Sequence, residues 1–203
     1  MKKNVFLAVT IAAGMLASCS GGQKKVTIVA SGGLTVNDKS IKIDPGFTHN
    51  EKEVTFSGDK ITLTVESTNG TSKTFDLTEN GSYLLNLQTD TLIGGIVNYG
   101  AGGMPGSITS EQLDHIIDST KQLMAGQNAS DDKKTYFLPP FTIKKLSIQD
   151  NAKVVGSFKG IPYSNEPDGS GKIPEVYKFF TNKQKRETLT DLLTQREKLK
   201  SVH

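Results

Sequence analysis

The residue with the most distinctive chemistry in this chain of 203 residues is its single cysteine, Cys19. A deprotonated thiol is a nucleophile and a ligand for soft metals. One thiol cannot form an internal disulfide, and alone it cannot build a thiolate metal site. The chemistry of Cys19 therefore depends on its sequence context, in which an apolar segment and the small residues Ala17 and Ser18 precede it.

The segment before Cys19 has the organisation of an export signal. Lys2 and Lys3 form a short positive region, and residues 5–16 carry no charge. This run is shorter than the ~20 residues that a helix needs to cross ~30 Å of hydrocarbon. A positive start, a short apolar run and small residues at its end are typical of a secretory signal peptide.

The four residues Leu16, Ala17, Ser18 and Cys19 resemble the lipobox of bacterial lipoproteins, with Bacteroidota-type proteins as the candidate subgroup. The resemblance implies diacylglyceryl transfer to the Cys19 thiol, cleavage between Ser18 and Cys19, and acylation of the new amino terminus. Two or more acyl chains, at ~0.8 kcal/mol per buried CH₂, give stable anchoring. The alternative is an ordinary secretory signal with a cysteine near the cleavage site.

This interpretation divides the chain into three parts. Residues 1–18 are predicted to be the signal peptide that is removed, and residues 19–25, rich in Gly and Ser, a flexible tether. Residues 26–203 are predicted to form a single globular domain, with a possible sub-boundary in the Gly-rich stretch 100–106.

The residues after Cys19 bear on the membrane to which the protein is attached. Ser20 is not the aspartate that retains lipoproteins in the inner membrane under the enteric sorting rule, which favours the outer membrane. The absence of an acidic run after Cys19 favours the periplasmic face over the cell surface. The predicted localisation is therefore the outer membrane, lipid-anchored, on its periplasmic side.

Charge and composition restrict the class of partner. The chain has 24 basic and 21 acidic residues, and two of the lysines belong to the predicted signal peptide, so the mature chain is nearly neutral. Neither this balance nor the predicted compartment favours nucleic-acid binding. The expected partners are the membrane, through the N-terminal lipid, and an envelope protein or glycan. No cofactor is expected apart from the covalent lipid on Cys19.

A second group that could do chemistry is Asp114, His115 and Asp118, because histidine near carboxylates can transfer protons or ligate metals. All three fall on the polar face of a predicted helix, so the competing interpretation is a solvated helix surface. The other histidines are His49, expected in a loop, and His203, the last residue. No converging set can be assembled, and we assign no catalytic residue and no metal ligand.

The Gly-rich stretch 100–106 lies between a predicted strand and a helix N-terminus, where backbone N–H groups can bind an anion. Gly100, Gly102 and Gly103 are the candidate anion-binding residues. The stretch lacks the spacing of a P-loop or of a dinucleotide fingerprint. The alternative is a crossover from sheet to helix.

Two short patterns are similar to the Asp-Ser/Thr-apolar sequon of Bacteroidota-type periplasmic O-glycosylation. In these patterns Thr91 follows Asp90, and Ser119 follows Asp118. Thr91 and Ser119 are therefore candidate glycosylation sites, and chance occurrence of a three-residue pattern is the alternative.

Residues 26–99 alternate apolar and polar side chains with a period of two, which indicates β-strands. Turn dipeptides recur along this region: Asn37-Asp38, Pro45-Gly46, Gly58-Asp59, Asn69-Gly70 and Asn80-Gly81. Such spacing predicts an antiparallel meander or a small sandwich. The stretch 61–87, with its corner at residues 79–83, looks somewhat like transthyretin-like β-sandwiches, an alternative for this region.

The second half of the chain adds two amphipathic helices, near 110–125 and 183–199. Thr109 and Gln112 predict a capping box at the first helix, and Gly126 predicts its end. Further strands are expected over 142–148, 153–158 and 176–180. The predicted class is α+β, mainly antiparallel sheet, with both helices packed on one face.

The sequence therefore favours a lipid-anchored cell-envelope protein whose domain is a non-catalytic binding or structural unit and not an enzyme. The alternative is a periplasmic hydrolase with a site around the 100–106 stretch and His115.

Overall fold

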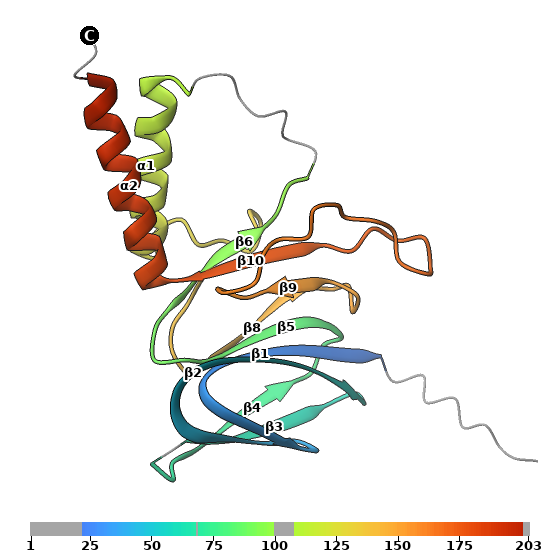
Figure 1. Cartoon of the computed structure of the whole chain (residues 1–203). Coiled ribbons are helices and arrows are strands. Elements are labelled where there is room, and N and C mark those ends of the chain that lie inside the picture. The colour runs from blue at the N-terminus through green and yellow to red at the C-terminus, as the bar shows by residue number, and fades with distance from the viewer. Residues whose placement is uncertain (1–21, 68, 100–107, 201–203) are drawn as a thin grey trace, which may run out of the picture.

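The computed structural model describes residues 22–67, 69–99 and 108–200. Within these ranges the protein is of the α+β class, with two β-sheets and two helices (Figure 1). The strands are β1 (Gln23–Asn37), β2 (Ser40–Ser57), β3 (Ile61–Glu66), β4 (Ser72–Leu77), β5 (Gly81–Leu87), β6 (Leu92–Ile96), β7 (Thr135–Leu138), β8 (Thr142–Ser147), β9 (Lys153–Val155) and β10 (Val176–Thr181). The helices are α1 (Ser110–Met124) and α2 (Asn182–Lys200).

The first sheet is built on a long hairpin of β1 and β2, which curls around its own core (Figure 1). The predicted turn at Asn37-Asp38 is confirmed, and Asp38 adopts a positive φ of 50°. The turn predicted at Pro45-Gly46 is wrong: β2 continues through it as an irregularity opposite Gly32. Gly32 has a φ of +111°, and a Cβ there would lie 2.1 Å from the Asp44 carbonyl oxygen.

The described strands of the first sheet follow the order β4-β3-β2-β1-β5-β8, which differs from the predicted meander. Neighbours along the chain pair antiparallel in the β1–β2 and β3–β4 hairpins, but β1 pairs with β5, and β2 with β3, in parallel. β2 stays paired with β1 along its length, and β3 aligns in parallel with the beginning of β2 at Ser40 rather than folding back on its end. Apart from Pro45-Gly46, the turn signals predicted where strands end, and tertiary packing determines which strands pair.

The second sheet has the order β7-β6-β10-β9 among the described residues. The strands predicted at 142–148 and 176–180 are present as β8 and β10, whereas the one predicted at 153–158 ends at Val155. Residues 156–159 form a turn, closed by the amide of Lys159 donating to the Gly156 carbonyl. This turn reappears in the candidate site.

Two apolar cores share β1 and β5 as a common wall, because alternate residues of a strand face opposite sides. Ile28 and Leu85 lie in the core inside the curled sheet. Val29 and Leu84 lie in the second core, with Tyr177 and residues of β6 to β8. All four of these aliphatic side chains are fully buried. The two sheets are thus joined through a continuous apolar contact.

The helices form an antiparallel pair that projects from one end of the second sheet (Figure 1). The predicted capping box of Thr109 and Gln112 and the end of the helix at Gly126, with a φ of 74°, are both confirmed. The prediction that both helices pack on one face of the sheet is wrong. Since α2 starts directly after the last residue of β10, it continues away from the sheet, and none of its residues is buried.

Candidate functional site

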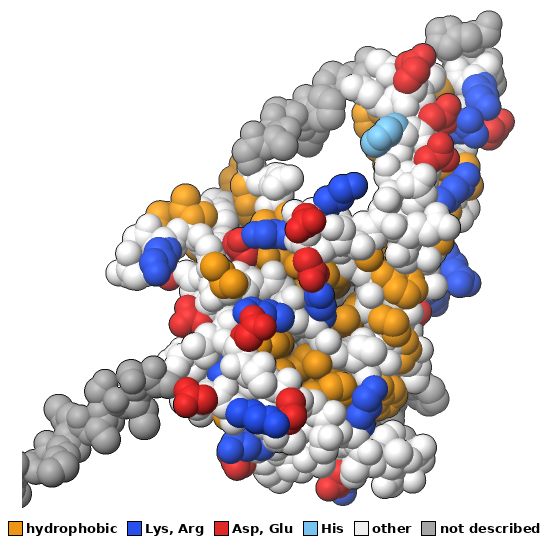
Figure 2. Space-filling view, turned by 180° about the vertical axis from the view of Figure 1, so that it is seen from behind, with side chains coloured by type: hydrophobic (Ala, Val, Ile, Leu, Met, Phe, Trp, Pro, Cys, Tyr) orange, Lys and Arg blue, Asp and Glu red, His pale blue; other side chains and the backbone are white. Residues whose placement is uncertain are grey.

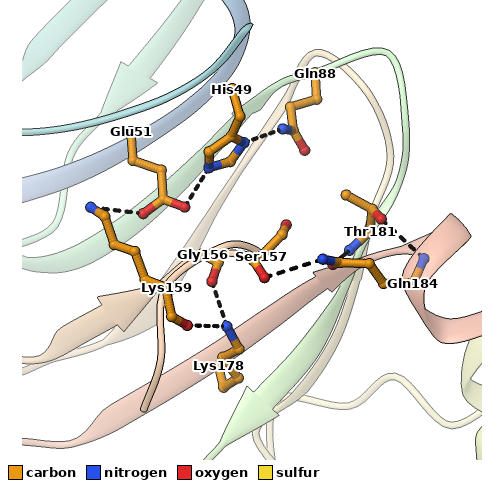
Figure 3. Close-up of polar contacts among 9 residues, drawn as sticks. All are labelled: His49, Glu51, Gln88, Gly156, Ser157, Lys159, Lys178, Thr181 and Gln184. Carbon is orange, nitrogen blue, oxygen red and sulfur yellow. Dashed lines mark hydrogen bonds and ion pairs between the residues drawn. The ribbon is translucent and has the colours of Figure 1, made fainter. Parts of the chain in front are cut away.

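A cluster of polar side chains connects the two sheets at the junction of β2, the end of β5, the 156–159 turn and β10 (Figure 3). We call it the junction cluster. Its charged or polar members are His49, Glu51, Gln88, Lys159 and Lys178. The carboxylate of Glu51 is at its centre, with a side chain only 3% exposed.

His49 bridges two strands of the first sheet. Its Nε2 lies 2.6 Å from Glu51 Oε1, and its Nδ1 lies 2.8 Å from the Gln88 amide nitrogen. With the amide donating to Nδ1, Nε2 carries the proton that it donates to the carboxylate. The ring also meets Phe158 edge-on, with centroids 4.4 Å apart. Both ring nitrogens are thus engaged by neighbouring side chains.

The 156–159 turn approaches Glu51 from the second sheet. Lys159 Nζ lies 3.0 Å from Glu51 Oε2. Burial favours the neutral acid, but the hydrogen bonds and charges of Lys159 and His49 outweigh it, so the pKa of Glu51 is below its usual range. Glu51 is therefore a carboxylate at neutral pH.

Lys178 of β10 binds the same 156–159 turn through two hydrogen bonds. The side chain is almost fully buried in β10, and its Nζ donates to the carbonyls of Gly156 at 2.5 Å and Lys159 at 2.6 Å. Burial lowers the pKa of Lys178, and the negative charge of Glu51 partly offsets that effect. A buried ammonium requires such acceptors, so the turn and β10 are mutually dependent.

The junction cluster continues into the start of α2. Gln184 donates from Nε2 to the Ser157 carbonyl at 3.2 Å. Gln184 also forms a capping box with Thr181, in which each side chain bonds the other residue's backbone N–H. Asp90 accepts from the Lys183 amide at 3.1 Å, so a carboxylate lies at the positive end of the helix dipole.

The arrangement resembles a hydrolase triad only in its carboxylate–histidine pair. In a triad the second ring nitrogen faces a nucleophile. Here that nitrogen faces the Gln88 amide, and Ser157 Oγ is buried without a hydrogen-bond partner among the described residues. The geometry supports a structural connection between the sheets rather than nucleophilic catalysis.

We expect Gly156→Ala to lower the free energy of unfolding by about 1–3 kcal/mol, because an added Cβ would overlap the carboxylate. That Cβ would lie 1.8 Å from Glu51 Oε1. Urea unfolding followed by circular dichroism measures the change. The matched control is Gly160→Ala, where no heavy atom lies within 4 Å of the new Cβ. Equal stability of the two variants would contradict this packing.

The sequence pattern did not predict the junction cluster. His49 was expected in a loop but lies within β2, beside the irregularity opposite Gly32. A usable signal was Lys178, a charged residue inside the aromatic strand 176–180. A lysine at the centre of a buried strand needs a partner, which predicts a polar cluster there.

His115 lies on an exposed face of α1, in an open groove that it lines with Ile108, Glu111, Gln112 and Ile116. Asp114 points to α2 instead and pairs with Arg196 at 2.6 Å. Asp118 is exposed. Among the described residues, no three His, Cys, Asp or Glu side chains form a group that could hold a metal ion.

The remaining predicted sites divide into two sets. Ser18, Cys19, Gly100, Gly102 and Gly103 lie outside the described residues. The candidate glycosylation sites are described, and both are half-buried. The Thr91 carbonyl accepts a hydrogen bond from the backbone N–H of Asn182 at the start of α2. Ser119 lies in a groove between α1 and Lys185.

The start of the fold differs from the tether predicted over residues 19–25. β1 already begins at Gln23, and Lys24 is fully buried. Its Nζ donates to the Gly58 carbonyl at 2.5 Å and to Asn80 Oδ1 at 3.0 Å. The composition of this stretch did not reveal that Lys24 finds two acceptors within the fold.

The corner at residues 79–83 is closed by a hydrogen bond from the Tyr83 hydroxyl to the Glu79 carbonyl, at 2.5 Å.

Neither described helix is long and apolar enough to cross a membrane. The fold and site together define an α+β protein of two sheets with a projecting helical pair. No protein-family model matches the chain, and the searches of characterised proteins and of solved structures return no significant match.

Proposed function

We propose that this protein is a lipid-anchored protein of the bacterial cell envelope, attached through Cys19 to the periplasmic side of the outer membrane, and that its domain binds a partner without catalysis. The observation that carries the proposal is the motif Leu16, Ala17, Ser18 and Cys19 at the end of a short apolar run. The start of β1 at Gln23, directly after this motif, supports it.

The junction cluster supports the non-catalytic part of the proposal. Each nitrogen of His49 and each oxygen of Glu51 already contacts another side chain. A general base needs a free position within hydrogen-bond reach of its substrate. The His49–Glu51 pair is therefore engaged in joining the sheets.

The helical pair is the binding surface that this proposal assigns. Its two helices project from the sheets, and Ile116 of α1 and Ile108, which precedes α1, are exposed around an open groove of about 440 Å³. Ile108 and Ile116 give the groove an apolar surface, and Glu111, Gln112 and His115 also line it, a mixture of apolar and polar groups that fits the side chains of a protein partner. Asp114 and Arg196 fix the helices to each other at this end.

We expect Cys19→Ala to abolish lipid attachment and to move the protein from the membrane to the soluble fraction of the envelope, because the thiol is the acceptor of the lipid. The measurement is metabolic labelling with an alkyne fatty acid, followed by fractionation. Ser20→Ala, which leaves the motif intact, is the control and should keep both label and membrane attachment. Label on Cys19→Ala, or none on the native chain, would contradict the proposal.

A further inference from the structure

The distance between the anchor and the fold is short. Gly22 is the first described residue, three positions after Cys19, and extended chain spans at most ~3.6 Å per residue, so the two Cα atoms lie within about 11 Å. The end of β1 is itself fixed, because Lys24 is buried and bonded to Gly58 and Asn80. A lipid on Cys19 would therefore keep this end of the domain close to the bilayer surface.

The same end of the molecule carries the turn after β8 and the loop between β9 and β10. Gly22 and Gln23 line one open cavity together with Ile148, Asp168 and Lys172. Figure 1 shows the loop and the start of β1 projecting to the same side, whereas the helical pair projects from another part of the molecule. A membrane surface held next to Cys19 would therefore also lie next to the loop between β9 and β10.

Large apolar side chains are exposed on these segments, and we call them the apolar rim: Ile148, Ile161, Tyr163 and Ile173. Ile148 is 85% exposed and Tyr163 fully exposed. Figure 2 shows hydrophobic side chains on the surface of the projecting loop. Scattered single apolar residues are ordinary, but a group beside an anchoring point is typical of an interaction surface.

Hydrogen bonds hold the apolar rim in place. Asn165 donates to the Pro174 carbonyl at 2.6 Å and joins the two arms of the loop. Asn151 donates to Asp168 at 2.5 Å and joins the loop to the turn that carries Ile148. The Tyr99 hydroxyl donates to the Pro162 carbonyl at 3.0 Å. The rim is therefore presented by a braced loop.

We infer that the apolar rim is a docking surface for the lipid bilayer to which Cys19 is attached, an inference that rests on the proposed lipid anchor. Acyl chains and a second apolar contact together bind membranes more firmly than either alone, and tyrosine is favoured at the interface. The flanking charges are Asp150, Lys153, Glu166, Asp168 and Lys172. Lys159 also lies in this loop, so acids and lysines are equal in number among these charges, and the contact is apolar and does not depend on anionic lipid.

The chain contains no tryptophan, so one introduced tryptophan reports on a single position. The full protein carrying Tyr163→Trp, isolated from its native membranes, is reconstituted into phosphatidylethanolamine–phosphatidylglycerol vesicles whose acyl chains are brominated. We expect severalfold stronger fluorescence quenching than for Leu199→Trp, at the far end of α2 and itself partly exposed. The quenching should persist at high salt and with less phosphatidylglycerol.

Each outcome is decisive. Failure of the protein to float with the vesicles would overturn the lipid anchor, and the docking surface with it. Flotation with equal quenching at positions 163 and 199 would overturn the docking surface and leave the anchor in place. Quenching that disappears at high salt would overturn the apolar nature of the contact.

Discussion

Replacing Glu51 with alanine is expected to lower the free energy of unfolding by about 2–4 kcal/mol at pH 7, because buried charged groups lose their partner. The side chain is 3% exposed and contacts both His49 and Lys159. The charge of Lys178 would also lose the nearby carboxylate that favours its protonated form. Urea unfolding of the native chain and the variant measures the difference.

The same comparison in acid tests the cause. The folded-state pKa of Glu51 lies below its usual value of 4.5, so its contribution is fully present above pH 4.5 and is lost as the pH falls through the lowered pKa. The stability difference between native chain and variant should therefore shrink below pH 4.5.

Glu53→Ala is the matched control for this variant. Glu53 lies two residues further along β2, with a side chain 52% exposed and an ion pair of 3.3 Å to Lys25. Exposed pairs contribute up to about 1 kcal/mol, so this variant should be nearly as stable as the native chain. Similar losses for both glutamates would show that the junction cluster has no special role.

Leu84→Ala is expected to cost about 2–5 kcal/mol of unfolding free energy, because it leaves a cavity in the core between the sheets. Leu84 is fully buried on β5 and packs in the core that contains Tyr177 and Phe179 of β10. Thermal and urea unfolding measure the loss. Ile148→Ala, at a position 85% exposed, is the control and should change stability by less than about 0.5 kcal/mol. A loss below about 1 kcal/mol at Leu84 would contradict this account of the core.

Glu51→Ala and Leu84→Ala both weaken the contact between the two sheets, through different kinds of interaction. Leu84 tests the apolar contact between the sheets, and Glu51 tests the polar one. Since Lys178 links the 156–159 turn to β10, loss of either contact should loosen the base of α2, where Gln184 bonds Ser157. The projecting helical pair thus depends on the sheet junction for its orientation.

Local features of the fold could be predicted from the sequence because they depend on neighbouring residues. The turn at Asn37-Asp38 and the capping box of Thr109 and Gln112 involve side chains within a few positions of the backbone groups they serve. The parallel pairing of β1 with β5 could not be predicted, because it is decided by packing between residues such as Ile28 and Leu85, far apart in the chain.

The junction cluster depends on contacts between residues far apart in the chain and on one local irregularity in β2. Its members come from four separate segments, and no spacing along the chain relates His49 to Gln88 or Lys178. The Pro45-Gly46 pair suggested a turn, which removed His49 from the expected sheet. The irregularity opposite Gly32 allows the strand to continue, because only glycine accepts that backbone conformation so close to Asp44.

A lipid at Cys19, a fold that begins at Gln23 and a helical pair that projects elsewhere give the proposed protein a defined orientation. The apolar rim would face the bilayer, and the groove around Ile116 would remain open to a partner in the periplasm. In this proposed arrangement the junction cluster would determine how the helical pair is oriented relative to the membrane.

The most direct test of the lipid anchor is mass spectrometry of the N-terminal peptide of the protein isolated from its native membranes. The account predicts a peptide that begins at Cys19 and carries a diacylglyceryl group on its thiol. A mature peptide in which the Cys19 thiol is unmodified, or one that begins before Cys19, would contradict it.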